Sequence, residues 1–166
     1  MSTLTAARLR ELLDYSPETG KFRWRTTGKG RCRVKGGDQP GYIGNHGYRS
    51  IGVLGREYLA HRLAWLYVHG EWPSKFPDHI NLDKLDNRIA NLRAASKSQN
   101  SANRGAPKSN TSGFKGVWWS KVGNKWTAAI TVGGKAQHLG YFATPEAGHA
   151  AYCMAATRIY GEFARA

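Results

Sequence analysis

Cysteine, acidic residues and long apolar runs are all scarce in this chain. Only two of its 166 residues are cysteines, Cys32 and Cys153, and they lie far apart with no CxxC or His-rich pattern beside them. This spacing indicates neither a disulfide framework nor a structural zinc site, and it favours a reducing cytoplasm. No apolar run approaches the roughly 20 residues that span a bilayer, and the N-terminal sequence lacks a secretory h-region. We therefore expect a soluble cytoplasmic protein without a membrane partner.

Acidic residues are outnumbered in both parts of the chain. The formal net charge is +14, with 25 Lys and Arg against 11 Asp and Glu. Through residue 100 there are 17 basic and nine acidic residues, and beyond it eight and two, which excludes an acidic regulatory segment in either half. Such an excess favours a polyphosphate partner through counterion release and electrostatic steering. A basic protein of another kind, such as a ribosomal one, would carry the same charge, so charge alone does not decide the function.

The segment PDHINLDKLDNRIANLRAASKSQNSANR, residues 77–104, carries the side chains that phosphodiester hydrolysis needs. That reaction requires a base that takes a proton from water and a cation that neutralises charge on the phosphate. His79 is the only imidazole in the segment, and an ordinary pKa near ~6.5 leaves much of it neutral and basic. Asp78 and Asn100 offer hard oxygen ligands of the kind that Mg²⁺ accepts alongside water and substrate phosphate.

The same segment has a readable local structure. Residues 78–80 and 92–95 are candidate strands joined by a polar loop over 81–91, and Ser96 or Ser98 is placed to cap a short helix that carries Asn100. A hairpin followed by a helix brings the two ends of the segment together. Asn91 lies twelve positions after His79 and nine before Asn100, where the loop rejoins the hairpin. We interpret it as an orienting residue that ties the loop to the histidine strand.

The pattern of Asp-His, then Asn91 and Asn100, with LDNRIANLR between, resembles the HNH nucleases with their ββα-metal fold. YLAHRLAWLYVHGEWP upstream is similar to free-standing phage HNH endonucleases. Asparagine at the last position, where many members have histidine, resembles the phage and intron homing endonucleases. The resemblance implies Mg²⁺ or Mn²⁺ rather than zinc or nickel, metal binding by Asp78 and Asn100, and water activation by His79. It also implies that Asn91 positions the histidine loop and that the products carry 5'-phosphate and 3'-hydroxyl ends.

Three further residues are possible supports for this site, each with a structural alternative. Asn87 either contributes to the site or only caps the turn that follows it at Arg88. His61 and Arg62 begin an apolar-rich segment over 61–69 that predicts a helix. Either side chain would reach a bound phosphate, or would simply pack, as most histidines on amphipathic helices do.

Upstream of this segment the chain predicts a scaffold. Leu4, Leu9, Leu12 and Leu13 fit one helical face, and a turn over Ser16–Gly20 leads to a strand over Phe22–Arg25. A basic loop over 28–37 and a hairpin formed by Tyr42–Val53 and Arg56–Leu59 follow.

The C-terminal part alternates like three strands and then becomes helical. Phe114–Trp119, Lys125–Val132 and Ala136–Phe142 are separated by turns at Gly123-Asn124 and Gly133-Gly134. Thr144 is a candidate N-cap, with Pro145 at the first position of a helix that continues to Tyr160.

Four motifs of this part, FKGV, KWTAAI, HLGYF and the AxxAY-containing helix, resemble the ethylene-response-factor (AP-two type) DNA-binding domain over residues 112–163. The resemblance implies that the sheet lies in the major groove. Trp118 and Thr131 stand where members often have arginine, so base specificity does not transfer. Trp126 and Tyr141 could instead pack the sheet on its helix, which we prefer for Tyr141. The DNA-contact candidates are Lys115, Trp118, Ser120, Lys125, Trp126, Thr131, Lys135 and His138.

Together these patterns predict a two-domain α+β protein. An HNH nuclease domain with its N-terminal scaffold would span 1–104, a linker rich in small and polar residues 105–111, and the DNA-binding domain 112–166. We expect a Mg²⁺-dependent endonuclease acting on double-stranded DNA, in the host cytoplasm if phage-encoded. A monomer, which we favour, would nick one strand. A non-catalytic DNA-binding regulator with a vestigial nuclease fold is the alternative, ahead of a basic RNA-associated protein.

Overall fold

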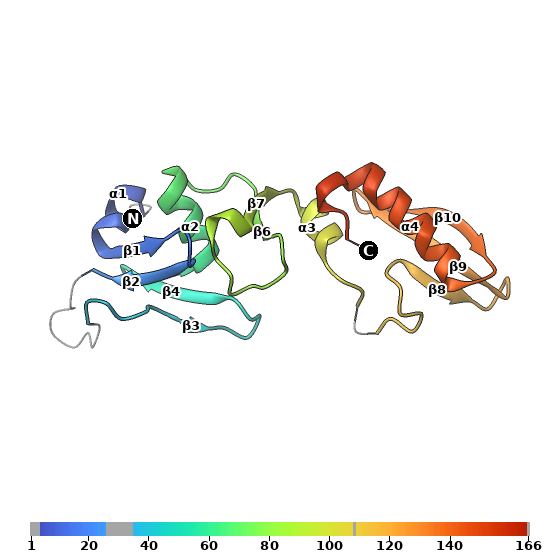
Figure 1. Cartoon of the computed structure of the whole chain (residues 1–166), viewed down its shortest axis with the longest axis horizontal. Coiled ribbons are helices and arrows are strands. Elements are labelled where there is room, and N and C mark those ends of the chain that lie inside the picture. Colours follow the sequence, from blue (N-terminus) through green and yellow to red (C-terminus); the bar gives the residue numbers. More distant parts are fainter. Residues whose placement is uncertain (1–3, 26–34, 108, 166) are drawn as a thin grey trace. The chain divides into compact units, whose positions relative to one another are not determined.

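The computed structural model describes residues 4–25, 35–107 and 109–165 (Figure 1). The chain divides into two compact units, Met1–Ala94 and Ala95–Ala166. Each unit mixes helices with small sheets, so the expected α+β class is confirmed. Cys32 and most of the basic loop expected over 28–37 lie outside the described residues. The two units divide ahead of the linker expected at 105–111, and the boundaries of the functional domains stay a prediction.

In its described residues, 4–25 and 35–94, the first unit contains two α-helices and three small sheets. The sheets pair β1 with β2, β3 with β4 and β5, and β6 with β7. Leu13, expected on the first helix, instead begins β1 and pairs with Trp24 of β2, because hairpin pairing overrides the local helical pattern. The elements are α1 (Ala6–Leu12), β1 (Leu13–Ser16), β2 (Lys21–Trp24), β3 (Tyr42–Ile43), β4 (Arg49–Val53), β5 (Arg56–Leu59), α2 (Ala60–His69), β6 (Phe76–His79), the 3₁₀ turn η1 (Ile89–Asn91) and β7 (Leu92–Ala95).

One apolar core joins these elements. Leu9 of α1, Phe22 of β2, Ile51 of β4 and Leu63 of α2 are all almost fully buried. Burying a side chain of this size stabilises the fold by about 1.5–3 kcal/mol. The core therefore holds α2 against both N-terminal sheets and provides a rigid support for β6.

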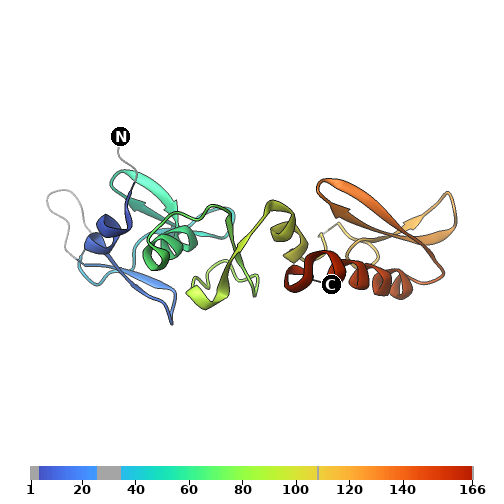
Figure 2. The same cartoon turned by 90° about the horizontal axis from the view of Figure 1, so that it is seen from above.

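The second unit contains the expected three strands and long helix. Its elements are α3 (Lys97–Asn103), β8 (Val117–Ser120), β9 (Lys125–Val132), β10 (Lys135–Phe142), α4 (Pro145–Tyr160) and the 3₁₀ turn η2 (Gly161–Phe163). The sheet is antiparallel with the order β10-β9-β8. Figures 1 and 2 show α4 running along this sheet. Thr144 caps α4 by accepting a hydrogen bond from the backbone of Ala147 at 3.3 Å, as expected.

Strand register assigns every side chain of this sheet to one of two faces. Val117 lies opposite Ala128 and contacts α4 at Gly148, so the side chains in line with them face the helix. Side chains alternate along a strand, so their neighbours point away from α4. This second set forms the outer face, and it consists of Trp118, Ser120, Lys125, Thr127, Ala129, Thr131, Ala136, His138 and Tyr141.

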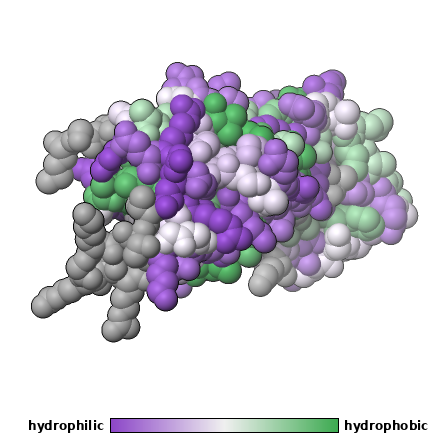
Figure 3. Space-filling view, turned by 60° about the vertical axis from the view of Figure 1, so that its left-hand side comes forward, coloured by the Kyte–Doolittle hydropathy of each residue, from purple (hydrophilic) through white to green (hydrophobic). Residues whose placement is uncertain are grey.

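Hydrophilic residues dominate much of the face seen in Figure 3, with hydrophobic areas between them. Among the helices in the described ranges, none combines the length and the apolar character needed to cross a membrane.

Candidate active site

β6 and β7 hold the two ends of the loop over 80–91. The backbone N–H of Ile80, just after β6, donates to the carbonyl of Asn91, just before β7, at 2.9 Å. The strand pair and the loop expected from the sequence are thereby confirmed. Ser96 then caps α3 in a capping box, in which its hydroxyl accepts from Gln99 N and the Gln99 side chain accepts from Ser96 N. This box ends β7 and begins the helix that carries Asn100.

The side chain of Asn91 bridges the two sides of the loop. Its Oδ1 accepts from the backbone N–H of Asn81 at 3.1 Å, and its Nδ2 donates to Asn81 Oδ1 at 2.9 Å and to the carbonyl of Asp86 at 2.8 Å. Asn91 is buried, so these hydrogen bonds form away from water. These hydrogen bonds fix the backbone that follows His79. They are compatible with the orienting role proposed for Asn91.

Asp86 braces the outside of the same loop. Arg88 Nε and Nη2 donate to the Asp86 carboxylate at 2.7 and 2.6 Å, and Asn81 Nδ2 donates to it at 2.8 Å. The Arg88 hydrogen bond is the main reason that the pKa of Asp86 is lowered to about 2. The loop therefore keeps an ionised carboxylate at its edge across the neutral pH range.

Asn87 forms a hydrogen bond with one nitrogen of the His79 ring. His79 Nε2 lies 3.2 Å from Asn87 Oδ1, and Asn87 Nδ2 donates to the carbonyl of Leu85 at 3.1 Å. The second contact fixes the amide orientation, so Oδ1 can only accept and Nε2 must donate. In this tautomer the basic lone pair of His79 is on Nδ1, and the imidazole is a proton acceptor.

The N-terminal hairpin fixes Asn87 in turn. The Tyr15 hydroxyl on β1 donates to the carbonyl of Asn87 at 2.7 Å, and burial raises the pKa of Tyr15 to about 12. Gly20, in the turn before β2, has φ +69°, and a Cβ at this position would collide with the backbone of Asn87 and Arg88. Only glycine allows this approach, so the hairpin and the His79 loop form one packed structure.

His79 lies in an aromatic environment that keeps it neutral. Its ring centroid is 5.1 Å from that of His61 and 5.9 Å from that of Tyr48. Burial lowers the pKa of His79, although the Asn87 hydrogen bond and the Asp78 carboxylate oppose this effect. Burial lowers the pKa of His61 more strongly, to about 3, with the charges of His79 and Arg62 adding to it. Both shifts favour the neutral form of the imidazole.

Asp78 is buried beside His79 and pairs with a strand neighbour. The Nε of Arg93, on β7, lies 3.2 Å from Asp78 Oδ2, and both side chains are largely shielded from water. Among the described residues, no three His, Cys, Asp or Glu side chains gather as a metal cluster. Asn100 lies half-buried on α3 in the second unit, so its expected pairing with Asp78 stays a prediction.

The three possible supporting residues have different surroundings. Asn87 contacts His79 directly, so it does more than cap the turn at Arg88. His61 packs edge-on against His79 inside the unit, and the Arg62 guanidinium lies 5.8 Å from the centre of the Trp72 ring. These packed positions favour the structural alternative for His61 and Arg62 over direct phosphate contact.

Sequence reasoning missed three residues around His79. Tyr48 contacts His61 edge-on and His79 at a tilted angle, Tyr15 donates a hydrogen bond to Asn87, and Arg93 pairs with Asp78. Tyr15 and Tyr48 are more than 30 positions from His79 in the chain, so no spacing pattern could show them. The contact of Arg93 with Asp78 could have been predicted, because Arg93 lies on the strand expected to pair with the strand of Asp78.

The outer face of the second unit holds most of the DNA-contact candidates. Trp118, Ser120, Lys125, Thr131 and His138 share this face by strand register. Tyr141 also lies there and is 60% exposed, with its ring 4.7 Å from that of His138. The interpretation of Tyr141 as a residue that packs the sheet on its helix is therefore wrong. Tyr141 follows a strand bulge at Leu139. The bulge shifts the in-and-out alternation of side chains along β10 by one residue, so Tyr141 points to the outer face.

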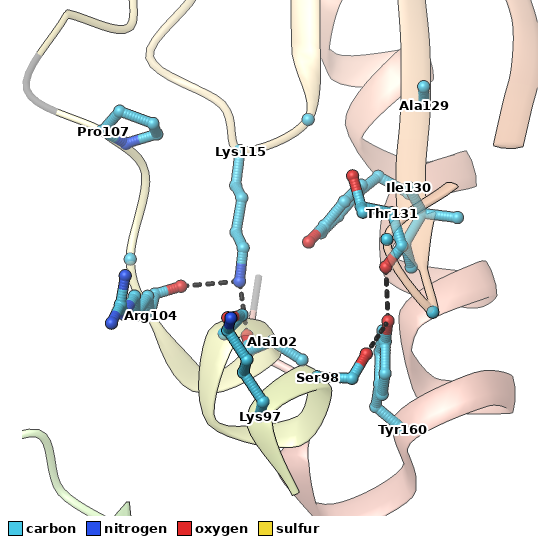
Figure 4. A pocket seen from close by; sticks show the side chains of 16 residues that line it. Lys97, Ser98, Ala102, Arg104, Pro107, Lys115, Ala129, Ile130, Thr131 and Tyr160 are labelled. Atoms are coloured by element: carbon cyan, nitrogen blue, oxygen red, sulfur yellow. Dashed lines mark hydrogen bonds between the residues drawn. The ribbon is translucent and has the colours of Figure 1, made fainter. Parts of the chain in front are cut away.

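Three DNA-contact candidates do not lie on the outer face. Trp126 and Lys135 are on the helix side by register, and Trp126 contacts Trp119 edge-on at 5.3 Å. Lys115 points into a cavity of about 730 Å³ in the second unit (Figure 4). Its ammonium group donates to the carbonyls of Ala102, Arg104 and Arg165, which uses all three of its hydrogens. These placements argue against outer-face DNA contacts by all three residues, and for a structural role of Lys115.

The chain is similar to two viral proteins and to one solved structure. A family model described as HNH endonuclease matches residues 58–102. Protein 3.8 of Escherichia phage T7 is 42% identical over 79 residues, which cover 47% of this chain and 64% of that protein. The chain therefore spans less than two thirds of this relative. A solved structure, described as DNA binding and cleavage by the HNH homing endonuclease I-HmuI, gives a TM-score of 0.42 at 24% identity, covering 55% of this chain and 51% of that one.

One relative extends over almost the whole chain. The uncharacterized HNH endonuclease L560 of Acanthamoeba polyphaga mimivirus is 31% identical over 154 residues, covering 92% of this chain and 70% of that protein. The match includes the segment over 58–102 that the family model recognises, where Asp78, His79 and Asn91 lie. This chain belongs to the HNH endonuclease family.

Proposed function

We propose that this chain is a metal-dependent DNA endonuclease that cuts phosphodiester bonds of double-stranded DNA. The products would carry 5'-phosphate and 3'-hydroxyl ends. The observation that carries the proposal is the hydrogen bond between His79 Nε2 and Asn87 Oδ1, which presents a neutral imidazole as a proton acceptor beside a buried carboxylate. The viral source of both curated relatives supports a phage or homing-type role.

His79 is the proposed general base. With Nε2–H held by Asn87, Nδ1 takes the proton from a water molecule, and the resulting hydroxide attacks phosphorus. The bond to the 3'-oxygen then breaks, and this oxygen leaves with a proton from solvent as the 3'-hydroxyl. The positive charge that develops on the ring is stabilised by the Asp78 carboxylate, whose attraction raises the pKa of His79 against the effect of burial.

Asp78 and Asn100 are the proposed metal-binding residues. Their donor atoms are a carboxylate oxygen and an amide oxygen, which fit Mg²⁺, or Mn²⁺ in its place, better than a soft metal. Bound there, the cation would neutralise charge on the phosphate and on the leaving oxygen. Asn91 is the orienting residue of this site, because its hydrogen bonds hold the loop between His79 and β7.

The second unit is the proposed DNA-binding domain. Its outer face combines aromatic rings with Lys125 and polar side chains, and its sequence resembles the AP-two type of domain. Beyond residue 100 the chain carries eight basic and two acidic residues, so this unit attracts the phosphate backbone. A monomer with one such domain and one active site would nick a single strand per binding event.

The Arg93–Asp78 ion pair favours a second candidate function. Arg93 already neutralises the carboxylate that would bind the metal. If this pair persisted in the presence of Mg²⁺, the chain would be a DNA-binding regulator with a vestigial nuclease fold.

Conversion of supercoiled plasmid separates the two functions. The protein is incubated with a mixture of plasmids in EDTA, in Mg²⁺ and in Mn²⁺, beside an Asp78→Asn variant. The endonuclease produces open circles only with metal, and its products accept a ligase because they carry a 5'-phosphate. Binding of the plasmids without any conversion in either metal would support the regulator.

A further inference from the structure

Three side chains form one row across the middle of the outer face. Thr127 of the central strand β9 lies directly opposite Trp118 of β8 on one side and opposite Tyr141 of β10 on the other. Directly opposed side chains of a sheet lie about 4.5–5.5 Å apart at Cβ, so the three are neighbours. The row therefore consists of one hydroxyl flanked by two aromatic rings.

The Thr127 hydroxyl has an unusual environment. The residue is only 4% exposed, and its Oγ1 has no hydrogen-bond partner among the residues that the structure describes. A buried hydroxyl without a partner destabilises a fold by about 1–3 kcal/mol, so such groups are rare unless they serve another purpose. The position of Thr127 on the outer face directs this hydroxyl away from α4 and toward whatever binds the sheet.

The flanking rings are exposed, unlike the hydroxyl between them. Trp118 is 46% exposed and Tyr141 is 60% exposed. Exposed aromatic side chains change rotamer readily, so a ligand that displaces them outward would reach Thr127 Oγ1. A ligand for this row must thus offer apolar groups to two rings and a hydrogen-bonding edge between them.

The base edges of DNA meet this description in the major groove. The outer face carries no arginine in its three described strands, and arginine is the most common reader of guanine. Thymine instead presents a methyl group to apolar side chains, and A·T pairs offer O4, N6 and N7 to a hydroxyl. Lys125, on the same face, supplies positive charge for the adjoining phosphates.

We propose that Trp118, Thr127 and Tyr141 read A·T pairs in the major groove, with the two rings on thymine methyl groups and the Thr127 hydroxyl bonded to the base edge between them. This inference rests on the proposed DNA-binding function of the second unit and names the base pairs that it prefers.

The test compares three duplexes with the full-length protein in EDTA, which prevents metal-dependent cleavage. One duplex alternates A and T, the second has deoxyuridine in place of every thymidine, and the third alternates G and C. Deoxyuridine removes only the major-groove methyl group and leaves the hydrogen-bonding edges unchanged. We expect fluorescence anisotropy to show binding of the A·T duplex about tenfold tighter than binding of either other duplex.

Substitutions at Thr127 assign the effect to the row. Thr127→Val keeps the shape of the side chain and loses no hydrogen bond of the free protein, so its melting temperature should equal or exceed that of the wild type. Its affinity for the A·T duplex should fall by about fivefold, and Thr127→Ser should retain most of the affinity. Gln137→Ala is the matched control, because Gln137 is exposed on the helix side of β10.

The outcomes distinguish this inference from the proposed function. Equal affinity for all three duplexes, or full affinity of Thr127→Val, would overturn the A·T reading while DNA binding stands. Failure to bind any duplex, even at low salt, would overturn the DNA-binding function together with the inference.

Discussion

Nε2 of His79 and Oδ1 of Asn87 lie 3.2 Å apart, and this contact determines the chemistry of the imidazole. The two residues are eight positions apart in the chain: His79 ends β6, and Asn87 lies within the following loop, which hydrogen bonds of Asn91 stabilise. The Tyr15 hydroxyl holds Asn87 from the N-terminal hairpin. The proposed base is therefore oriented by hydrogen bonds that reach back to the first strand of the chain.

Asn87→Ala should lower the rate of DNA cleavage by about 10- to 100-fold, as loss of an orienting partner does at comparable sites. The His79 ring would lose the acceptor that holds its tautomer, while Asp78 would remain in place. Single-turnover plasmid cleavage measures the effect. Asn45→Ala, at an exposed turn, is the matched control, and a normal rate for Asn87→Ala would show that this hydrogen bond does not orient the base.

Tyr15→Phe should destabilise the first unit by about 1–2 kcal/mol, because the buried carbonyl of Asn87 loses its hydrogen bond. Urea unfolding followed by circular dichroism measures the difference. Tyr42→Phe removes only an exposed hydrogen bond to Glu57 and should leave stability almost unchanged. Equal stability of both variants would mean that the hairpin does not brace the His79 loop.

The stability of the first unit should fall as the pH drops below 6.5, the ordinary pKa of a histidine. His61 has a pKa of about 3 when folded, so the unfolded chain binds its proton first, and folding loses up to about 1.4 kcal/mol per pH unit from this group between those two values. His61→Phe keeps a ring in place but cannot take up a proton. Melting curves of both proteins across this window should show a smaller loss in the variant, and parallel losses would contradict the neutral state of His61.

Lys125 and Lys115 should affect DNA binding differently. Lys125→Ala removes an exposed cation of the outer face and should reduce the slope of log affinity against log salt by about one. Lys115→Met should keep the slope but lower the melting temperature, because the carbonyls of Ala102 and Arg104 lose their donor. A salt titration of binding tests both variants. A reduced slope for Lys115→Met would show that its ammonium group reaches DNA.

Turn residues, helix caps and residue alternation predicted most of the secondary structure of the second unit. The bounds of β9 match the expected strand, and α4 begins at Pro145 after the Thr144 cap, since turn and cap residues act over a few positions. β7 matches the expected strand for the same reason, and Ser96 is one of the two residues expected to cap α3. Leu13 was wrongly assigned to the first helix. It pairs with Trp24 in a hairpin, and the spacing of leucines along the sequence carries no information about that partner.

The candidate site residues were harder to predict, because contacts between residues far apart in the chain define their surroundings. Chemistry and spacing led to the hypothesis for Asp78 and His79, yet the role of Tyr15 depends on a contact across 72 positions. Lys115 reads as a DNA-binding lysine in sequence, and only the fold shows that its ammonium group points to internal carbonyls. Tyr141 was misread because a strand bulge reverses the faces that simple alternation assigns.

Cleavage of supercoiled plasmid in Mg²⁺ by the wild type, His79→Ala and His69→Ala tests the central claim most directly. His69 is exposed at the end of α2 and serves as the histidine control. The account predicts metal-dependent cleavage by the wild type and by His69→Ala, and a loss of about 100-fold or more in His79→Ala, since a general base contributes roughly 100- to 10,000-fold. Cleavage by His79→Ala at the wild-type rate would contradict it.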